Sequence, residues 1–309
     1  MAPRSKSSPQ SVALHRGLGA RVLSAVFRPK QLLLLAVAVL GVVLIPTLLR
    51  SLPDLRDRPE YRLKAMDIVV SDLPLWVPQD LVERAVRSAG LAGELSVMDA
   101  NVVEEVAEAF RLQPWVARVD AVVKSVPARI EVELTFRRPV AMVQVENGMY
   151  PVDGEGILLP PTDFSVADTQ QFPLIMNVRS TPQGPAGTNW GDAAVLGAAS
   201  LAEQLSSEWN DLRLDAIWVT PHSNENANID DLTFELISPG GSHILWGRFP
   251  DTKHPGELTV EQKIGRLRKV LSERGSFDSP NGPYEIDIRH WLEISITQLS
   301  ATERIGSRR

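Results

Sequence analysis

LQPWVARVDAVVKSVPARIEVELTFRRPVA, residues 112–141, is the stretch that decides the fold. Its second half, 129–136, alternates apolar and polar residues, which is the pattern of a strand with one buried face. A second apolar-rich run, 116–124, precedes it, and the short link Ser125-Val126-Pro127 comes between the two. We therefore predict two antiparallel strands joined as a hairpin.

Two helices are predicted upstream of this hairpin. Apolar residues recur at helical spacing after Pro78, which suits a first turn, and Gly90 is an expected stop. A second helix follows, with Asp99 as its expected N-cap. With a short strand at Met66–Val70 in front, residues 62–137 form a β-α-α-β-β unit.

Residues 138–298 are predicted to be mostly strand, with two helices. One helix starts near Asn189, and the other begins at Thr259, where Thr259 and Gln262 fit a capping box. The second helix has a basic outer face that is either solvated or able to bind phosphates: Lys263, Arg266, Arg268 and Lys269. Strands are predicted at 140–145, 149–152, 157–159, 174–178, 214–219, 232–237, 243–246, 284–288 and 292–296. In the last of these, Leu292, Ile294 and Ile296 are expected to share one face.

An uncharged stretch of nineteen residues, 31–49, lies between Lys30 and Arg50. At about 1.5 Å per residue, a helix of eighteen residues spans about 27 Å, close to the hydrocarbon core of a bilayer. The apolar run exceeds the usual core of a signal peptide and no cleavage site follows it, whereas a buried core helix would show a polar face. We predict a single transmembrane helix. Four basic residues precede it and five follow it within twenty residues, so charge leaves its orientation open.

Composition and charge divide the 309 residues into two unlike parts. Residues 1–53 carry seven Lys or Arg and no Asp or Glu, while the other residues carry 25 basic and 38 acidic groups. The length allows about two domains. The absence of cysteine excludes a disulfide framework, thiol catalysis and a thiolate metal site.

Several motifs occur in a characteristic order along the chain. They are Leu112-Gln113-Pro114-Trp115-Val116, Lys124-Ser125-Val126-Pro127, Arg137-Arg138-Pro139-Val140-Ala141, Val152-Asp153-Gly154-Glu155-Gly156-Ile157-Leu158, Leu245-Trp246-Gly247-Arg248 and Ile286-Asp287-Ile288-Arg289-His290. In order and spacing they resemble the FtsQ/DivIB family of bitopic bacterial cell-division proteins. The resemblance covers about 62–298, together with the short N-terminal tail and the single span. The glycine-containing turn that usually follows Arg289-His290 is missing.

The resemblance implies an α+β fold and a division of the chain into parts. These are a cytoplasmic tail (1–30), a transmembrane helix (31–49), a linker (50–61), a POTRA domain (62–137), an FtsQ-type, mostly antiparallel β-domain with flanking helices (138–298) and a C-terminal tail (299–309). It also implies a place in the bacterial inner membrane at the division site, with the N-terminus in the cytoplasm and the large C-terminal part outside it.

The resemblance further implies a divisome scaffold for septum formation that is not an enzyme and needs no cofactor or metal. Its expected partners are FtsB- and FtsL-like bitopic proteins and other divisome components, with no nucleic acid and no small-molecule substrate. They are expected to bind largely by adding a strand to the C-terminal edge of the β-domain, because an edge strand exposes unpaired backbone groups. The alternative is an ordinary strand that the tail 299–309 covers. The expected partner-binding residues are Arg289, His290, Trp291, Glu293, Ser295 and Thr297.

Two other functions compete with this interpretation. A POTRA-containing factor of another envelope assembly or secretion pathway usually carries tandem POTRA units and a barrel, for which this chain has too little length. An anchored hydrolase would need a nucleophile or metal constellation, but no two histidines have zinc-type spacing. Gly240-Gly241-Ser242-His243 and Asp153-Gly154-Glu155-Gly156 are predicted to be turns, and Trp115 is predicted to pack in a core.

Overall fold

The computed structural model describes residues 29–50, 58, 60–64, 67–91, 95–221 and 228–299. The chain divides into two units, Met1–Leu55 and Arg56–Arg309. Most of the predicted cytoplasmic tail and linker, and all but the first residue of the predicted C-terminal tail, lie outside the described residues.

The first unit contains the helix α2 (Pro29–Arg50), which is 22 residues long. Its described leucine, valine and isoleucine side chains are 44–73% exposed. The predicted span begins at residues 31 and 32, whose side chains lie outside the description. Among the residues that the structure describes, no helix is both long enough and apolar enough to cross a membrane.

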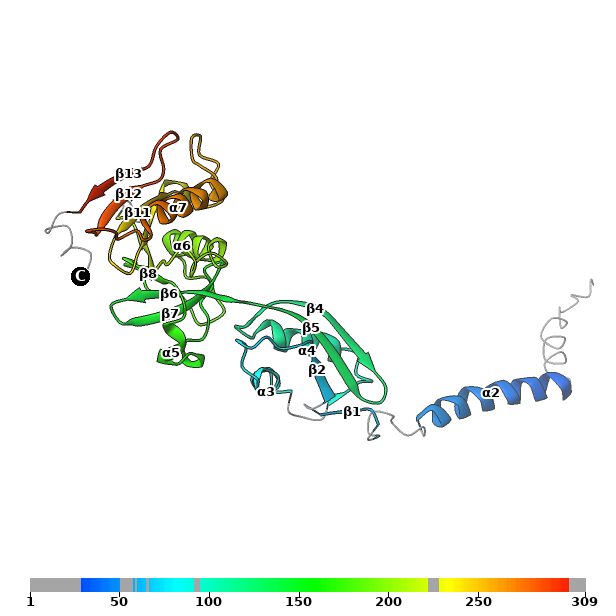
Figure 1. Cartoon of the computed structure of the whole chain (residues 1–309). Coiled ribbons are helices and arrows are strands. Elements are labelled where there is room, and N and C mark those ends of the chain that lie inside the picture. The colour runs from blue at the N-terminus through cyan, green and yellow to red at the C-terminus, as the bar shows by residue number, and fades with distance from the viewer. Residues whose placement is uncertain are drawn as a thin grey trace, which may run out of the picture. The chain divides into compact units, whose positions relative to one another are not determined.

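The second unit begins with a small sheet covered by two helices (Figure 1). Its strands are β2 (Ile68–Val70), β4 (Val116–Ser125) and β5 (Arg129–Phe136), in the order β2-β5-β4, and its helices are α3 (Leu81–Ser88) and α4 (Val102–Arg111). Two further strands, β1 (Arg62–Leu63) and β3 (Leu95–Ser96), pair with each other and are antiparallel. In the chain, β1 comes before β2, and β3 comes between α3 and α4. The predicted hairpin is confirmed, because β4 and β5 pair antiparallel from Val116 with Phe136 to Ser125 with Arg129.

The predicted starts of both helices are wrong by a few residues. Helix α3 begins at Leu81, after Pro78, with Asp80 at its N-cap. Helix α4 begins at Val102, so Asp99 lies too far upstream to cap it. The Asp99 carboxylate instead accepts the backbone N–H of Ser96 at 3.0 Å.

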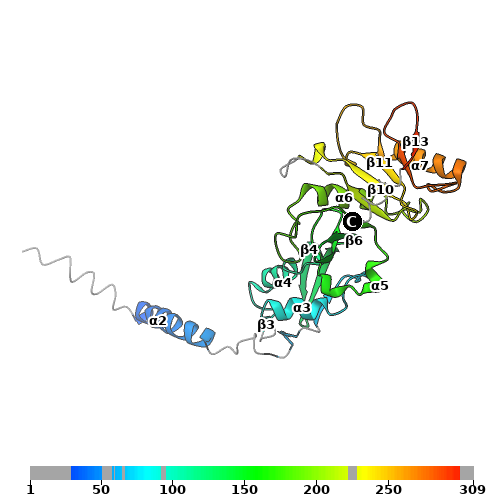
Figure 2. The same ribbon diagram turned by 90° about the vertical axis from the view of Figure 1, so that its left-hand side faces the viewer.

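The rest of the second unit is built on an eight-stranded sheet, seen from two sides in Figures 1 and 2. Its strands are β6 (Pro139–Val145), β7 (Gly148–Asp153), β8 (Leu174–Met176), β9 (Ala216–Val219), β10 (Phe234–Ile237), β11 (His243–Gly247), β12 (Tyr284–Asp287) and β13 (Ser295–Gln298). The order is β13-β12-β11-β10-β9-β8-β6-β7. The predicted strand at 157–159 forms only isolated bridges, to Val152 and Asn189. Short helical turns occupy η3 (Pro161–Asp163), α5 (Val166–Thr169) and η4 (Ile229–Asp231).

The sheet is mostly antiparallel, as predicted, but two helices introduce parallel pairs. Strands β8 and β9 are parallel neighbours joined through α6 (Ala193–Gln204), and β11 and β12 are parallel neighbours joined through α7 (Val260–Arg274). A third parallel pair is β6 with β8. Because such crossovers are right-handed and both advance in the same direction across the sheet, α6 and α7 cover the same face.

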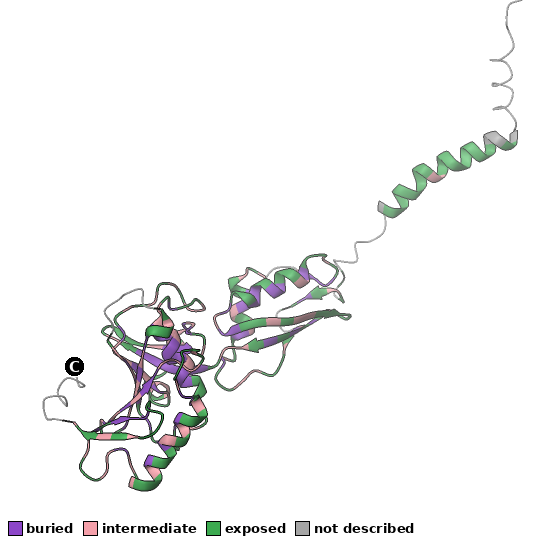
Figure 3. Cartoon of the chain, turned by 90° about the horizontal axis from the view of Figure 1, so that it is seen from above, coloured by how far each residue is buried: buried purple, intermediate pink, exposed green. Residues whose placement is uncertain are grey.

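Alternation along the strands buries the helix-covered face. Residues in register across four strands, Ile217, Leu236, Ile244 and Ile286, are all fully buried. Figure 3 shows the same alternation as buried and exposed segments along the ribbons. The sheet is therefore held by one apolar layer beneath α6 and α7, and its terminal strand β13 belongs to this layer through Ile296.

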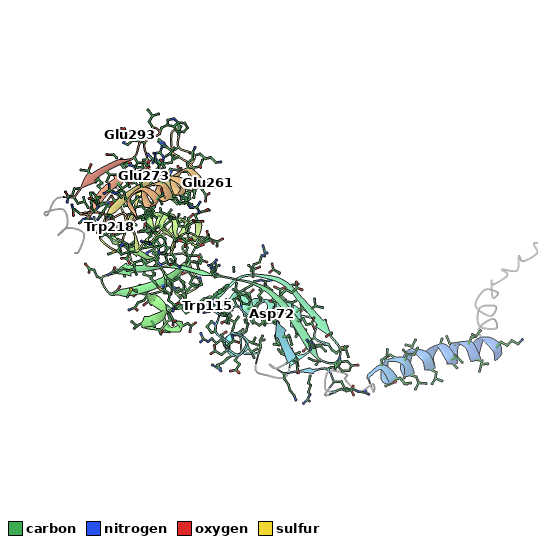
Figure 4. All side chains as sticks on the ribbon, in the orientation of Figure 1. Asp72, Trp115, Trp218, Glu261, Glu273 and Glu293 are labelled. Atoms are coloured by element: carbon green, nitrogen blue, oxygen red, sulfur yellow. The ribbon has the colours of Figure 1, made fainter. Side chains whose placement is uncertain are left out.

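A carboxylate joins the eight-stranded part to the β2-β5-β4 part. The side chain of Asp163, only 8% exposed, accepts hydrogen bonds from the Arg84 guanidinium at 2.9 Å and from the Trp115 indole N–H at 2.8 Å. Phe164 stacks on Trp115 with ring centroids 5.8 Å apart, and Leu159 is buried in the same apolar cluster. Trp115 is a core residue, as predicted, and is labelled in Figure 4.

Candidate functional site

The strand β13 lies at one edge of the eight-stranded sheet and pairs antiparallel with β12. The N–H of Leu299 donates to the carbonyl of Pro283, so this pair is hydrogen-bonded. In an antiparallel ladder such pairs alternate with pairs whose backbone groups point outward. Thr297 and Ser295 therefore bond to β12, whereas the N–H and C=O groups of Ile296 and Gln298 point away from it. They face the edge of the sheet that no other strand of the described residues covers, which we call the free edge.

The predicted position of this last strand, 292–296, is wrong by about three residues. The structure places β13 at Ser295–Gln298 and inserts a turn, residues 288–294, between β12 and β13. The turn forms without a glycine, and this is why its position was not evident from the sequence. We call residues 288–294 the terminal turn.

The face assignment of the predicted strand is right for its second half only. Ile294 and Ile296 are half-buried and pack against the sheet core, while Ser295 and Thr297 are exposed on the other side. Leu292 does not share the buried face, because it lies in the terminal turn with its side chain 90% exposed. Trp291 beside it is 71% exposed.

The side chain of Arg266, in α7, holds the terminal turn by bonding to three of the turn's backbone carbonyls. Its Nη1 donates to the carbonyls of Ile288 and Glu293, both at 3.2 Å, and its Nη2 donates to the carbonyl of Trp291 at 2.6 Å. Arg266 is half-buried, and Glu293 is labelled in Figure 4. One guanidinium thus satisfies three carbonyls of the turn, as its planar set of five N–H donors permits.

A second charged contact fixes the start of the turn. Arg289 donates to both oxygens of Asp287, Nε at 2.9 Å and Nη2 at 2.8 Å, and its backbone N–H donates to the same carboxylate. The His290 ring nitrogen Nε2 lies 3.5 Å from that carboxylate. Burial by itself would raise the pKa of Asp287, but the hydrogen bonds from Arg289 and its positive charge outweigh burial and lower that pKa.

The prediction that Lys263 belongs to a basic outer face is wrong. Its side chain is 2% exposed, its Nζ lies 2.5 Å from Glu257 Oε1, and it stands over the Trp246 ring at 4.6 Å from the centroid. Burial lowers the pKa of Lys263, and the Glu257 carboxylate opposes that effect. Arg268 is exposed and pairs with Glu208, in agreement with the solvated alternative for that position.

The two glycine-containing motifs are turns, as predicted. The Ser242 hydroxyl is fully buried and hydrogen-bonds to Asp278 at 2.6 Å, in the turn that leads into β11. The Asp153 carboxylate accepts the backbone N–H groups of Glu155 and Ile157, which closes the turn after β7. Within the described ranges, no three His, Cys, Asp or Glu side chains are grouped so that they could hold a metal ion.

The structure therefore brings the six predicted residues together along the terminal turn and β13. All six are exposed: Arg289, His290, Trp291, Glu293, Ser295 and Thr297. The sequence reasoning missed Arg266, Asp287 and Leu292 as parts of this region. A carboxylate two residues before an arginine was a usable signal for Asp287, whereas the contact of Arg266 depends on tertiary packing alone.

Comparisons with known proteins found two similar curated proteins. A "Cell division protein FtsQ" from Anaeromyxobacter sp. (strain K) is 26% identical over 210 residues, which cover 68% of this chain and 63% of that protein. A "Cell division protein FtsQ" from Koribacter versatilis (strain Ellin345) is 25% identical over 136 residues, covering 44% of this chain and 38% of that protein. The chain thus aligns with less than two thirds of the length of either relative. No family model matches the chain.

Proposed function

We propose that this chain is a membrane-anchored scaffold of the division machinery. Its two relatives support an FtsQ-family cell-division protein. Its proposed partners are small bitopic coiled-coil proteins of the FtsB and FtsL type, together with other divisome components. Its proposed work is binding and not catalysis.

The free edge of β13 is the observation that carries the proposal. The outward N–H and C=O groups of Ile296 and Gln298 form a row that an added strand can complete. Backbone hydrogen bonds would supply affinity without depending on sequence, and the exposed side chains of Ser295 and Thr297 would select the partner. Arg289, His290, Trp291 and Glu293 would contact it along the terminal turn.

The proposed anchor is the uncharged stretch of residues 31–49. Eighteen of these residues would span about 27 Å as a helix at about 1.5 Å per residue, close to the hydrocarbon core of a bilayer. We place residues 62–137, as a POTRA domain, and residues 138–298, as the β-domain, outside the cytoplasmic membrane at the division site. The cytoplasmic tail is residues 1–30.

Site-specific crosslinking in membranes tests the scaffold function. A photo-reactive residue is placed in the full chain at Thr297 of β13 or, as the control, at Met149 of β7, which is 44% exposed at the opposite edge of the same sheet. We expect short single-span coiled-coil proteins to be captured at Thr297 and not at Met149. Capture of outer-membrane barrel components alone would overturn the proposal in favour of an envelope-assembly factor.

A further inference from the structure

The terminal turn combines exposed apolar side chains with a fixed backbone. Trp291 and Leu292 are 71% and 90% exposed, and no described side chain covers them. Arg266 nevertheless bonds to carbonyls before, within and after this pair, at Ile288, Trp291 and Glu293. The backbone of the turn is therefore held in place while its two apolar side chains face the solvent.

We infer that Arg266 is a positioning residue, which holds the terminal turn so that Trp291 and Leu292 form an apolar anchor for the chain that pairs with β13. This inference rests on the proposed function and assigns the partner an apolar side chain next to its pairing segment. The turn is continuous with β13, since Asp287 pairs with Ser295 and closes the ladder at the turn. A strand added at the free edge therefore passes beside the anchor.

Preorganisation is the physical reason for the contribution of Arg266. Fixing a flexible loop on binding costs conformational entropy, and a loop that is already held avoids much of this cost. Aromatic side chains at fixed positions commonly dominate binding energies. Arg289 fixes the start of the terminal turn independently of Arg266, because its guanidinium is bonded to Asp287 at the end of β12.

The chain offers a matched control on the same helix. Arg268 lies two residues from Arg266, is 61% exposed and pairs with Glu208. Among the described residues, it forms no hydrogen bond or ion pair with the terminal turn. Arg268→Ala removes the same charge from α7 as Arg266→Ala. Arg266→Lys keeps the charge but has only one ammonium group to reach three carbonyls.

The experiment measures amide hydrogen exchange of residues 289–294 in the full chain, and its affinity for the extracytoplasmic segment of the FtsB-like protein encoded in the same genome. For Arg266→Ala we expect faster exchange in the turn and about tenfold weaker binding. Arg266→Lys should fall between, and Arg268→Ala should match the parent.

Two results would overturn the inference: unchanged exchange in Arg266→Ala, or faster exchange with unchanged affinity. If the parent chain fails to bind the segment at all while Arg266→Ala still loosens the turn, the proposed partner is wrong, and the hold of Arg266 on the turn stands.

Discussion

Replacing Asp163 with alanine removes the carboxylate that joins the β2-β5-β4 part to the eight-stranded part. Two effects contribute to the cost. The Trp115 N–H, 2.8 Å from the carboxylate and on a side chain only 2% exposed, loses its acceptor, which costs about 1–3 kcal/mol. The pair with Arg84 adds about 0.2–1 kcal/mol, since Arg84 is 36% exposed and water screens it.

We therefore expect Asp163→Ala to lower the free energy of unfolding by about 1–4 kcal/mol. The assay is urea unfolding of the full chain in detergent, followed by circular dichroism, where this loss moves the midpoint by about 1 M. Asp163→Asn keeps an acceptor for Trp115 and should lose less. Glu104→Ala is the control, because Glu104 forms an exposed pair with Arg111. If Asp163→Ala unfolds at the same midpoint as Glu104→Ala, the reasoning about the buried carboxylate is wrong.

Three further predictions concern the helix α7 and the turn beside it. Lys263→Ala should cost about 3 kcal/mol because it leaves the part-buried Glu257 carboxylate without its ammonium partner, with only the backbone N–H of Arg248 still donating to it. The double variant Lys263→Met, Glu257→Gln should regain most of that stability, and equal urea midpoints for the two would contradict this. Asp287 has a lowered pKa in the folded chain, so its stabilising effect is complete above about pH 4 and is lost as the pH falls through the folded pKa. The difference in Tm between the parent and Asp287→Asn should therefore shrink from pH 5 to pH 3, and a constant difference would refute the assignment. Thr259→Ala should cost about 1 kcal/mol in urea unfolding by removing half of the capping box, and no loss would mean that the cap is dispensable.

Features set by neighbours in sequence could be predicted. The capping box of Thr259 and Gln262 and the strand 129–136 agree with the structure, because both depend on side chains a few residues apart. The mostly-strand character of residues 138–298 follows from the same local patterns, whereas the α+β class and the mostly antiparallel sheet were implied by the resemblance to the FtsQ/DivIB family. The prediction of Asp99 as an N-cap was wrong, because its carboxylate accepts the backbone N–H of Ser96 and not an N–H of the helix.

Features set by packing could not be predicted from the sequence. Lysine is usually solvated, so the sequence placed Lys263 on an exposed face, and only the fold shows that Trp246 and Glu257 enclose it. The terminal turn has no glycine, so the pattern of apolar residues suggested a strand that continued through Leu292. The contact of Arg266 with this turn joins residues more than twenty positions apart in sequence, and no local pattern signals it.

The free edge of β13 is tested most directly by two variants at one position. Gln298→Pro removes an N–H that points away from β12, whereas Gln298→Ala keeps that N–H, and both remove the side-chain hydrogen bond to Asn281. The measurement is the affinity of each full chain for the extracytoplasmic segment of the FtsB-like protein, with the Tm recorded to show that each variant is folded. We predict that Gln298→Ala binds like the parent and that Gln298→Pro binds at least about tenfold more weakly. Equal affinities of the two folded variants would contradict strand addition at β13.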